Sequence, residues 1–598
     1  MSKEKVAKLD CVFIRRFKKC LAIMFPSWTE TSTILLVLLL GLSFLQQALY
    51  YNSGLIPSQY IQVLVDEDHA EFQNVVFNSI VIIISTALVK SLVMFVGGIL
   101  YINWRGSLTK FIHKFYFADD NYYKLNVLQR DIDNLDQRIT QDVDKFCKEF
   151  STIFSTLVIS PFIIGYYTYQ CYDSTKYIGV VSIYGYFILG TIFNKILMSP
   201  IIKLVFQQEK LEGNFRFKHM QIRVNAESTA FYNSSLLEEK RTNIKLENLL
   251  RVQYKLIAYQ LFLQCSVNFF DYSGSIVSYI VVSIPVFRGD FHHLDAGERA
   301  AVISKYSFVS IYLVNSFSQL IDLSNKISDI AGYIFRIGEV LEYFKDNKKS
   351  FGTSSQQGTV FIDNDDDLSD GVLFKLRNIT YSTPFTSDKQ LVKDLNLEIV
   401  LEENILINGK TGSGKTSLLR ILSGISQPDF GNILRKKSVL EKLSVLFLPQ
   451  KPLLTDGSLK QQVIYPEDED ACLDDLLESR RNEKIEKYLE LVNMTEVCQR
   501  VGGIDHKVEW NWEDVLSPGE MQRLSFARLF YHQPVCAVLD EATSALDVET
   551  EKEMYQLCQS FEITLVSVGH RDSLHQFHRK ILFLDGNGGW LLHALPQS

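Results

Sequence analysis

The first part of the chain alternates between long apolar stretches and polar segments. A helix needs ~20 mostly apolar residues to cross ~30 Å of hydrocarbon, and six stretches are candidates for such spans. They are Thr33–Tyr50, Val75–Tyr101, Ile153–Tyr169, Tyr177–Met198, Cys265–Val286 and Val302–Leu323. The pattern predicts a cytosolic N-terminal segment over residues 1–32 and a transmembrane domain with six helices over residues 33–344.

Lysine and arginine gather in alternate loops between these spans. Seven basic residues precede the first span, the next loop has none, and the loops Arg105–Phe150 and Ser199–Gln264 have eight and ten. Basic loops remain in the cytosol, so we expect both termini on the cytosolic side. The two basic loops have helical composition, which predicts that the membrane helices continue into the cytosol.

Several polar side chains interrupt the predicted spans. A charge at mid-membrane costs about 2.5–3.5 kcal/mol on insertion scales, so such groups normally face a cavity or a partner. Interfacial positions and hydrogen bonds between helices are the alternative interpretation. The candidates are Lys90, Lys195, Asp271, Asn315 and Asp322.

A polar segment separates this part of the chain from a second kind of sequence. Residues 345–371 are rich in Ser and Gly and then acidic, which is typical of a flexible linker. Beyond it, the runs VLFKLRNITY and LVKDLNLEIV alternate between apolar and polar residues, as strands do. We therefore expect residues 372–598 to form a soluble α/β domain.

Composition supports this division and excludes other classes. A hydrophobic content of 47% is high for a chain of soluble domains, and 22% charged residues require a water-soluble part. The net charge of −8 argues against nucleic-acid binding, which needs a basic face. The nine cysteines contain no C-x-x-C pair, which excludes a disulfide scaffold and the usual zinc spacings.

A glycine-rich loop follows the strand-like run NILIN and precedes a helical run. It fits G-x-x-x-x-G-K-[ST], a pattern whose backbone N–H groups surround phosphate oxygens at a helix N-terminus. The residues expected to bind ATP here are Gly409, Lys410, Thr411, Gly412, Ser413, Gly414, Lys415, Thr416 and Ser417. The pattern places Lys415 on the β- and γ-phosphates and the Thr416 hydroxyl near Mg²⁺.

Two acidic residues follow a second apolar strand, Val535–Leu539. An acidic residue in this position can hold Mg²⁺, and a second can orient the attacking water. Taken alone, two acidic residues after an apolar run more often mark the solvated end of a strand than a catalytic site. Because the pair lies in the same domain as the glycine-rich loop, we expect Asp540 to hold the metal and Glu541 to be catalytic.

A third segment, Leu516–Arg523, opens a helical run shortly before that strand. The segment resembles the signature motif of ATP-binding cassette (ABC) proteins, and Gln450, the Ser544–Asp547 loop and His570 appear in the order of that family. The resemblance implies that Gln450 binds ATP and Mg²⁺. It also makes His570 a catalytic contact to γ-phosphate.

The resemblance further assigns Ser517, Gly519 and Glu520 to ATP bound by a partner chain. Pro518 stands where most cassettes have glycine; its fixed φ suits a first helical turn, although it removes one N–H donor. Tyr381 and Phe385 are both near the position expected for the aromatic residue that stacks on adenine, and neither aligns well.

One membrane domain with one cassette is similar to an exporter-type half-transporter, which implies a dimer, most simply a homodimer, in a lipid bilayer. The segment DNLDQRI over residues 133–139 resembles a coupling motif of subfamily D, with Leu135 replacing proline. The resemblance makes Asp136, Gln137 and Arg138 coupling residues. Glu227, which precedes Phe231-Tyr232, falls in a second such motif.

Within subfamily D, three features resemble the members that transport cobalamin in lysosomes: Pro518, the EKLEGNFRFKHMQIRVNAE segment and GLIPSQY. The resemblance implies ATP-driven movement of cobalamin from the lysosomal lumen to the cytosol. It also implies transit through the endoplasmic reticulum membrane and an escort membrane protein of the LMBD type. A peroxisomal acyl-CoA transporter, and an ATP-binding scaffold or regulator that transports nothing, remain alternatives.

Overall fold

The computed structural model describes residues 11–128, 132, 135–291, 293–350, 360–362, 371–383, 389–436, 439, 443–467 and 475–595. The chain divides into two compact units. The first consists of Met1–Tyr122 and Arg130–Asp346, and the second of Tyr123–Gln129 and Asn347–Ser598.

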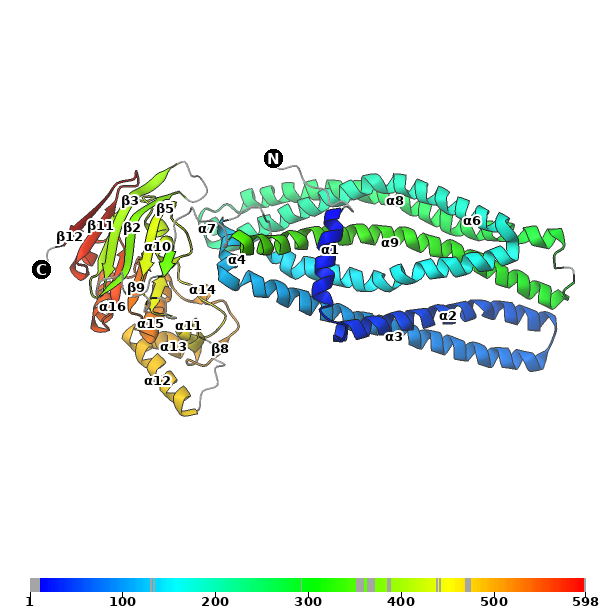
Figure 1. The fold of residues 1–598 in the computed structure, drawn as a ribbon, viewed down its shortest axis with the longest axis horizontal. Coiled ribbons are helices and arrows are strands. Elements are labelled where there is room, and N and C mark those ends of the chain that lie inside the picture. Colours follow the sequence, from blue (N-terminus) through cyan, green and yellow to red (C-terminus); the bar gives the residue numbers. More distant parts are fainter. Residues whose placement is uncertain are drawn as a thin grey trace. The chain divides into compact units, whose positions relative to one another are not determined.

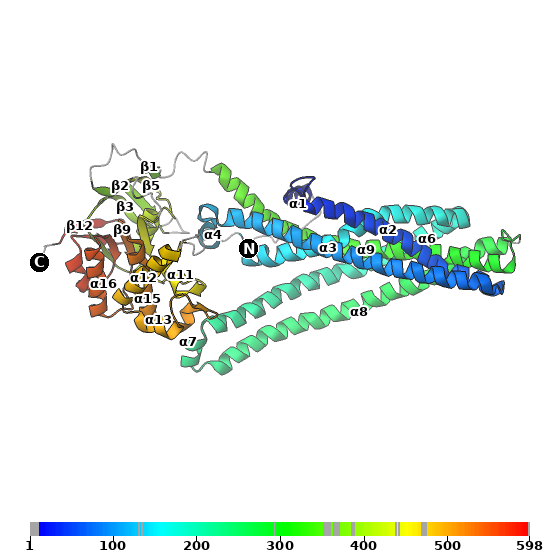
Figure 2. The ribbon, with the colours of Figure 1, turned by 90° about the horizontal axis from the view of Figure 1, so that it is seen from below.

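Long helices make up the first unit over its described residues (Figures 1 and 2). The main helices are α1 (Cys11–Met24), α2 (Thr31–Val65), α3 (His69–Tyr116), α6 (Val143–Val224), α8 (Ser235–Arg288) and α9 (Ala296–Ser350). The short helices α5 (Leu135–Gln137) and α7 (Ala226–Phe231) precede α6 and α8. The predicted continuation of membrane helices into the basic loops is confirmed, because α3, α6 and α8 extend far beyond their apolar stretches.

Helix α6 reverses its direction at a break in its backbone. Lys176 has φ 56° and ψ −154°, which breaks the helical backbone. Thr168 Oγ1 and Tyr184 OH are 3.0 Å apart although sixteen residues separate them, which an unbroken helix does not permit. The second half of α6 then lies beside α8, where Ser266 donates to Asn194 Oδ1 at 2.8 Å. Two predicted spans therefore lie in α6, one on each side of Lys176.

Four helical segments are long and apolar enough to cross a membrane among the residues that the structure describes. They are Thr31–Val65, His69–Tyr116, Leu135–Val224 and Ser235–Arg288, and the reversal gives the third segment two predicted spans. The sixth predicted span, Val302–Leu323, lies in α9. It is not among the four, and its sequence carries Lys305, Asn315 and several serines. Six spans thus stay a prediction.

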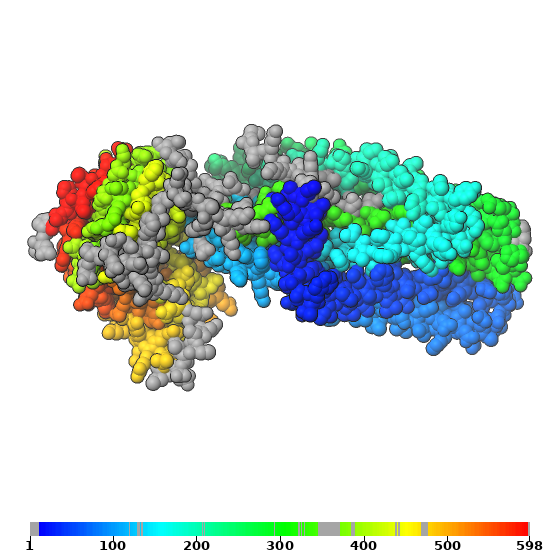
Figure 3. Space-filling view, in the orientation of Figure 1, coloured from blue at the N-terminus to red at the C-terminus, as the bar shows by residue number. Residues whose placement is uncertain are grey.

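Apolar exposure fits a membrane setting for this unit. Phe77 is 68% and Met94 72% exposed on α3, and water would strongly oppose such side chains on a long helix. The interior includes a cluster from α6, α8 and α9 with Tyr167, Val281 and Phe317. Helix α1 lies across the surface of this bundle (Figure 3).

The second unit contains two larger sheets with helices packed against them. One sheet has the order β1-β5-β2-β3 and the other β12-β11-β4-β10-β9-β6, in which all neighbours except β11 and β12 are parallel. The first sheet comprises β1 (Val360–Ile362), β2 (Val372–Ser382), β3 (Gln390–Val400) and β5 (Phe430–Arg435). The second comprises β4 (Ile405–Gly409), β6 (Val445–Leu448), β9 (Cys536–Asp540), β10 (Thr564–Val568), β11 (Lys580–Leu584) and β12 (Trp590–Ala594).

The parallel strands position the site. Their residues are buried hydrophobes such as Ile407, Val538 and Val566, as expected for strands covered on both faces. Helices α10 (Lys415–Ser423), α15 (Pro518–His532) and α16 (Val548–Ser560) pack against this sheet. The carboxyl ends of β4, β10, β9 and β6 meet at one edge, where ligands bind in such sheets.

The range predicted as a flexible linker, residues 345–371, contains regular structure at two places. Helix α9 continues to Ser350, and β1 pairs in parallel with β5 through Val360 and Ile433. The end of α9 is polar, and β1 consists of three apolar residues, which is too short a run to show a periodicity. The rest of that range lies outside the described residues, except Gly371.

Candidate functional site

The glycine-rich loop joins β4 to α10, as the strand–loop–helix pattern predicts. Gly409, Gly412 and Gly414 have φ values of 149°, 81° and 100°, in the region that favours glycine. A Cβ at Gly409 would lie 2.3 Å from the carbonyl oxygen of Leu584. Lys410, Thr411 and Gly412 are exposed at the tip of the loop. The loop conformation therefore depends on its glycines.

Lys415 is the buried cation of this loop. Its ammonium donates to the carbonyl oxygens of Gly409 at 2.8 Å and Lys410 at 3.2 Å. Burial lowers the pKa of Lys415, while the charges of Glu541 and Asp540 oppose that shift. These contacts fold the Lys415 side chain back along the loop, so its ammonium lies against the loop backbone.

Ser413 tests whether this loop fits a phosphate. Its side chain is buried, with 1% exposure, and Oγ has no hydrogen-bond partner among the described residues. A buried hydroxyl without a partner is costly and rare. Phosphate oxygens would accept from this hydroxyl and from Lys415, so the residues present fit the triphosphate group. Thr416 and Ser417 follow in the first turn of α10.

Asp540 ends β9 beside the first turn of α10. Its Oδ1 lies 3.5 Å from Thr416 Oγ1, so the two predicted Mg²⁺ ligands adjoin each other. Burial raises the pKa of the Asp540 carboxyl and the neighbouring Glu541 raises it further, while Thr416 opposes the shift. Partly buried oxygen ligands of this kind fit a hard divalent cation that also contacts phosphate.

Glu541 lies beside residues that follow two neighbouring strands. Gln450, which follows β6, donates to Glu541 Oε2 at 2.9 Å, and His570 Nε2, which follows β10, lies 3.7 Å from Oε1. Glu541 has φ 49°, an uncommon conformation for a residue with a side chain. The sheet order β10-β9-β6 explains why three residues that are distant in sequence meet at this carboxylate.

The signature segment forms the start of α15. Ser517 is its N-cap: Ser517 Oγ accepts from the Glu520 N–H at 3.3 Å, and Glu520 Oε2 accepts from the Ser517 N–H at 2.8 Å. Pro518 lies in the first turn, as its fixed φ favours. Burial opposes the charge of Glu520, but the hydrogen bonds from Ser517 and the charge of Arg500 hold its pKa below the usual value. Glu520 thus shapes the helix start.

A hydrogen-bond path leads from α15 to the residue after His570. Gln522 donates to Ser544 Oγ at 3.0 Å and accepts from the Ala545 N–H at 2.9 Å. Arg571 donates to the carbonyl oxygens of Ser544 at 3.1 Å and Leu546 at 2.9 Å. Gly519 completes this junction, since a Cβ there would lie 3.3 Å from the Ala545 carbonyl oxygen. The signature helix and the Ser544–Asp547 loop therefore form one connected piece.

The structure separates the two aromatic candidates for adenine stacking. Tyr381 is only 3% exposed, and its hydroxyl donates to the carbonyl oxygen of Gly414 at 3.2 Å. Its ring therefore packs beneath the glycine-rich loop and offers no free face of the kind that stacking needs. Phe385 lies outside the described residues.

Two family models match the chain. Residues 20–287 match ABC transporter transmembrane region 2, and residues 392–544 match ABC transporter. The chain is 46% identical to the human lysosomal cobalamin transporter ABCD4, over 98% of this chain and 97% of that protein. It is 47% identical to the mouse protein of the same name, again over 98% and 97% of the two chains.

The chain belongs to subfamily D of the ABC half-transporters. Rat ATP-binding cassette sub-family D member 3 is a more distant relative, 30% identical over 100% of this chain and 91% of that protein. A bacterial Atm1-family ABC exporter solved with ATP bound has a TM-score of 0.68 at 15% identity, covering 97% of this chain and 94% of that one. This likeness establishes the exporter-type fold.

As a subfamily D half-transporter, the protein binds ATP, couples its hydrolysis to transport and works as a dimer in a membrane. The signature segment is consistent with an ATP site shared between two chains. Among the described residues, no hydrogen bond or ion pair joins Ser517–Glu520 to the glycine-rich loop of the same chain.

The predicted coupling residues of this half-transporter lie in different surroundings. Asp136 and Gln137 are in α5, and Glu227 is exposed in α7. Arg138 is 5% exposed, and its guanidinium donates to Glu339 Oε2 at 2.7 Å and to the Arg336 carbonyl oxygen at 3.0 Å. The preceding Asp133 and Asn134 lie outside the described residues. No local pattern predicts the α9 partners of Arg138, because the contact spans about two hundred residues.

Proposed function

We propose that two copies of this chain form a homodimeric transporter that uses ATP to move cobalamin from the lysosomal lumen to the cytosol. The observation that supports cobalamin as the cargo is the 46–47% identity, over 98% of the chain, to the human and mouse lysosomal cobalamin transporters. The cassette geometry supplies the driving reaction.

The residues of the glycine-rich loop divide the work of holding ATP. Lys415 and the N–H groups of the loop bind the triphosphate, and the Ser413 hydroxyl donates to it. Thr416, Gln450 and Asp540 would hold Mg²⁺, which when bound neutralises charge on the phosphate oxygens. Ser517, Gly519 and Glu520 of the partner subunit close the site from the other side.

Hydrolysis requires a group that orients water. Glu541 accepts a hydrogen bond from that water, while Gln450 donates a hydrogen bond to its carboxylate and His570 lies beside it. His570 also contacts the γ-phosphate. ATP binding favours the closed dimer, and hydrolysis allows the dimer to reopen.

The membrane unit contains a cavity whose lining includes several polar side chains. A cavity between α6, α8 and α9 is lined by Tyr186, Asn194, Asp271 and Ser318 together with apolar side chains. Asp271, a charged residue predicted within a span, lines this cavity, and Ser318 donates to its Oδ1 at 3.3 Å. The side chain of Asp322 lies outside the described residues.

The distribution of basic residues supports cytosolic termini and three short loops in the lumen. The proposal places the working protein in the lysosomal membrane after passage through the endoplasmic reticulum membrane. An escort membrane protein of the LMBD type belongs to the same proposal.

Reconstitution tests the function directly. Purified protein in liposomes is supplied with ATP and with radiolabelled cobalamin on one side or the other, and ATPase activity is measured with cobalamin or acyl-CoA. We expect cobalamin to move toward the cassette side and to stimulate hydrolysis. Stimulation by acyl-CoA alone would favour the peroxisomal alternative, and hydrolysis without movement of either cargo would favour the scaffold.

A further inference from the structure

Helix α1 precedes the first predicted span in the sequence, yet it packs against α9, the last long helix of the first unit. Its buried residues Arg16, Cys20 and Met24 recur every four positions, so they form one face of the helix. Phe17 packs edge-on against Phe150 of α6 at 5.6 Å. The buried face thus fixes α1 against the bundle.

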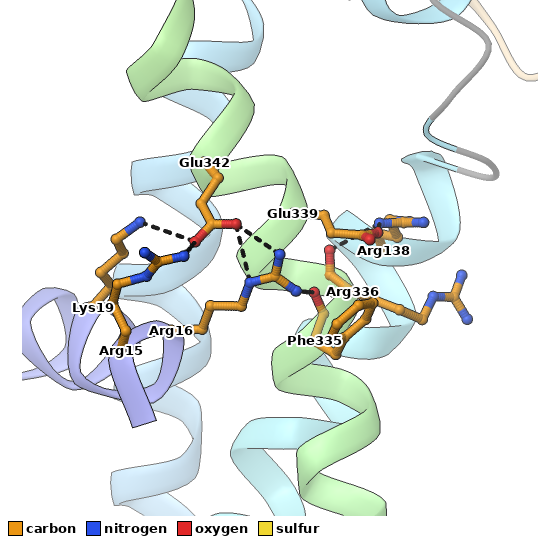
Figure 4. Close-up of polar contacts among 8 residues, drawn as sticks. All are labelled: Arg15, Arg16, Lys19, Arg138, Phe335, Arg336, Glu339 and Glu342. Atoms are coloured by element: carbon orange, nitrogen blue, oxygen red, sulfur yellow. Dashed lines mark hydrogen bonds and ion pairs between the residues drawn. The ribbon is translucent and has the colours of Figure 1, made fainter. Parts of the chain in front are cut away.

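Glu342 of α9 receives three cations from α1 (Figure 4). Arg16 donates from both Nη2 and Nε to Glu342 Oε2, at 2.6 and 3.1 Å. Arg15 and Lys19 lie 3.0 and 3.5 Å from Oε1. The Arg16 side chain is only 9% exposed, whereas that of Arg15 is 63% exposed, so Arg16 forms the inner contact.

Arg16 also grips the backbone and a ring of α9. Its Nη1 donates to the Phe335 carbonyl oxygen at 2.9 Å, and its guanidinium lies 4.4 Å from the centre of the Phe335 ring. Its methylenes pass directly over Gly338, where an added Cβ would lie 2.3 Å from Arg16 Cδ. Positions 335, 338 and 342 of α9 share one helical face, and that face belongs to α1.

The neighbouring face of the same turns belongs to the predicted coupling segment. Glu339 accepts from Arg138 at 2.7 Å (Figure 4). On the preceding turn of α9, Arg336 Nε lies 3.0 Å from Asp142 Oδ2. Residues 335–342 of α9 therefore connect α1 on one face with residues 138–142 on the other. Helix α9 is also the element from which the chain continues toward the cassette.

We propose that Arg16 and Glu342 are positioning residues that couple the cassette reaction to the membrane helices. These two residues hold α9 against α1. The turns of α9 that contact Arg138 therefore move together with the helix bundle and do not rotate independently of it. Burial opposes the charge of Glu342, but Arg16, Lys19 and Arg15 outweigh it and hold the pKa of that carboxyl below its usual value. The contact is therefore ionic at cytosolic pH. The inference rests on the proposed role of the coupling segment and not on the cargo.

Two variants loosen this contact in different ways. Glu342→Gln removes the charge with little change in shape, and Gly338→Ala inserts a methyl group where the Arg16 stem now lies. Gly332→Ala is the matched control, since a Cβ at Gly332 on the same helix meets nothing within 4 Å. Arg15→Gln removes only an exposed outer cation.

The full-length dimer in lipid nanodiscs reports coupling independently of cargo. A spin label is attached to a genetically encoded keto amino acid at Glu67, an exposed residue of the turn between α2 and α3. The distance between the two labels is measured with and without ATP, alongside ATPase activity and cobalamin transport in liposomes.

We expect Glu342→Gln and Gly338→Ala to hydrolyse ATP within about threefold of the parent rate, while transport per ATP falls about tenfold, a factor typical of a coupling free energy. The ATP-driven change in label distance should be lost in both, and both controls should behave like the parent. Unchanged coupling in both variants, or a parallel loss of hydrolysis and transport, would overturn the proposal. If the parent protein moves no cobalamin but its label distance responds to ATP, the cargo is wrong and this inference is still tested.

Discussion

Replacing Glu541 by glutamine removes one negative charge and retains almost the same shape. In the structure the carboxylate accepts from Gln450 at 2.9 Å and lies 3.7 Å from His570 Nε2. A glutamine can turn its oxygen toward one of these partners, but its amide cannot accept a proton from water. A general base contributes about 10²–10⁴ in rate, so we expect turnover to fall by that factor.

Binding should survive, because the loop that holds ATP does not depend on the Glu541 carboxylate. Lys415 is fixed by the carbonyl oxygens of Gly409 and Lys410, and Ser413 is already buried. The variant should therefore bind ATP and accumulate as a closed dimer. Phosphate release measures turnover, and filter binding with labelled ATP measures occupancy.

Glu562→Gln is a suitable control. Glu562 is another glutamate with positive φ, at 56°; it is exposed in the turn before β10 and lies outside the proposed site. If hydrolysis by Glu541→Gln stays within a factor of ten of the parent, the role assigned to Glu541 is refuted. If the variant loses ATP binding as well as turnover, the claim that Glu541 acts only on the water and not in ATP binding is refuted.

The remaining predictions concern three other positions. Ser517→Ala should lower cassette stability by about 1 kcal/mol through loss of the N-cap, whereas Ser517→Asp should keep the cap, measured by thermal unfolding, and abolish ATPase activity through its charge. Because the folded pKa of Glu342 is depressed, its stabilising contribution is present above the unfolded value of about 4.3 and is lost as pH falls through the folded pKa. The Tm difference between the parent and Glu342→Gln should reflect about 2 kcal/mol for a charged hydrogen-bonded group at pH 7 and vanish in acid; a constant difference would contradict the linkage. Asp271→Asn should reduce cobalamin transport about tenfold while basal ATPase activity is kept, since one charge–ligand contact is worth roughly that factor; unchanged uptake would exclude Asp271 from the cargo path.

The cassette was largely predictable because its chemistry lies in short local motifs. The loop Gly409–Thr416 has glycines where the backbone needs positive φ, and Asp540 ends an apolar run that forms the buried strand β9. The order of parallel strands then brings Gln450, Glu541 and His570 together. Family resemblance supplied that order before the sheet was known.

The membrane unit was predictable in its elements but not in its cross-links. Apolar length predicted six spans, which lie within long helices, and the break at Lys176 lies between two of the predicted spans. The ion pair between Arg16 and Glu342 joins residues 326 positions apart, and no local pattern specifies such a partner. Strand β1 was missed for a related reason: its pairing with β5 is long-range and its surroundings are polar.

The path from Gln522 through Ser544 to Arg571 has a consequence for enzyme kinetics. It ties the helix that begins at Ser517 to the residue beside His570 within one chain. In a dimer, Ser517 would contact the nucleotide in one ATP site and His570 the nucleotide in the other. ATP bound in either site would therefore change the geometry of the second site. The two hydrolysis events should therefore be cooperative, with a Hill coefficient above one that Gln522→Ala brings toward unity.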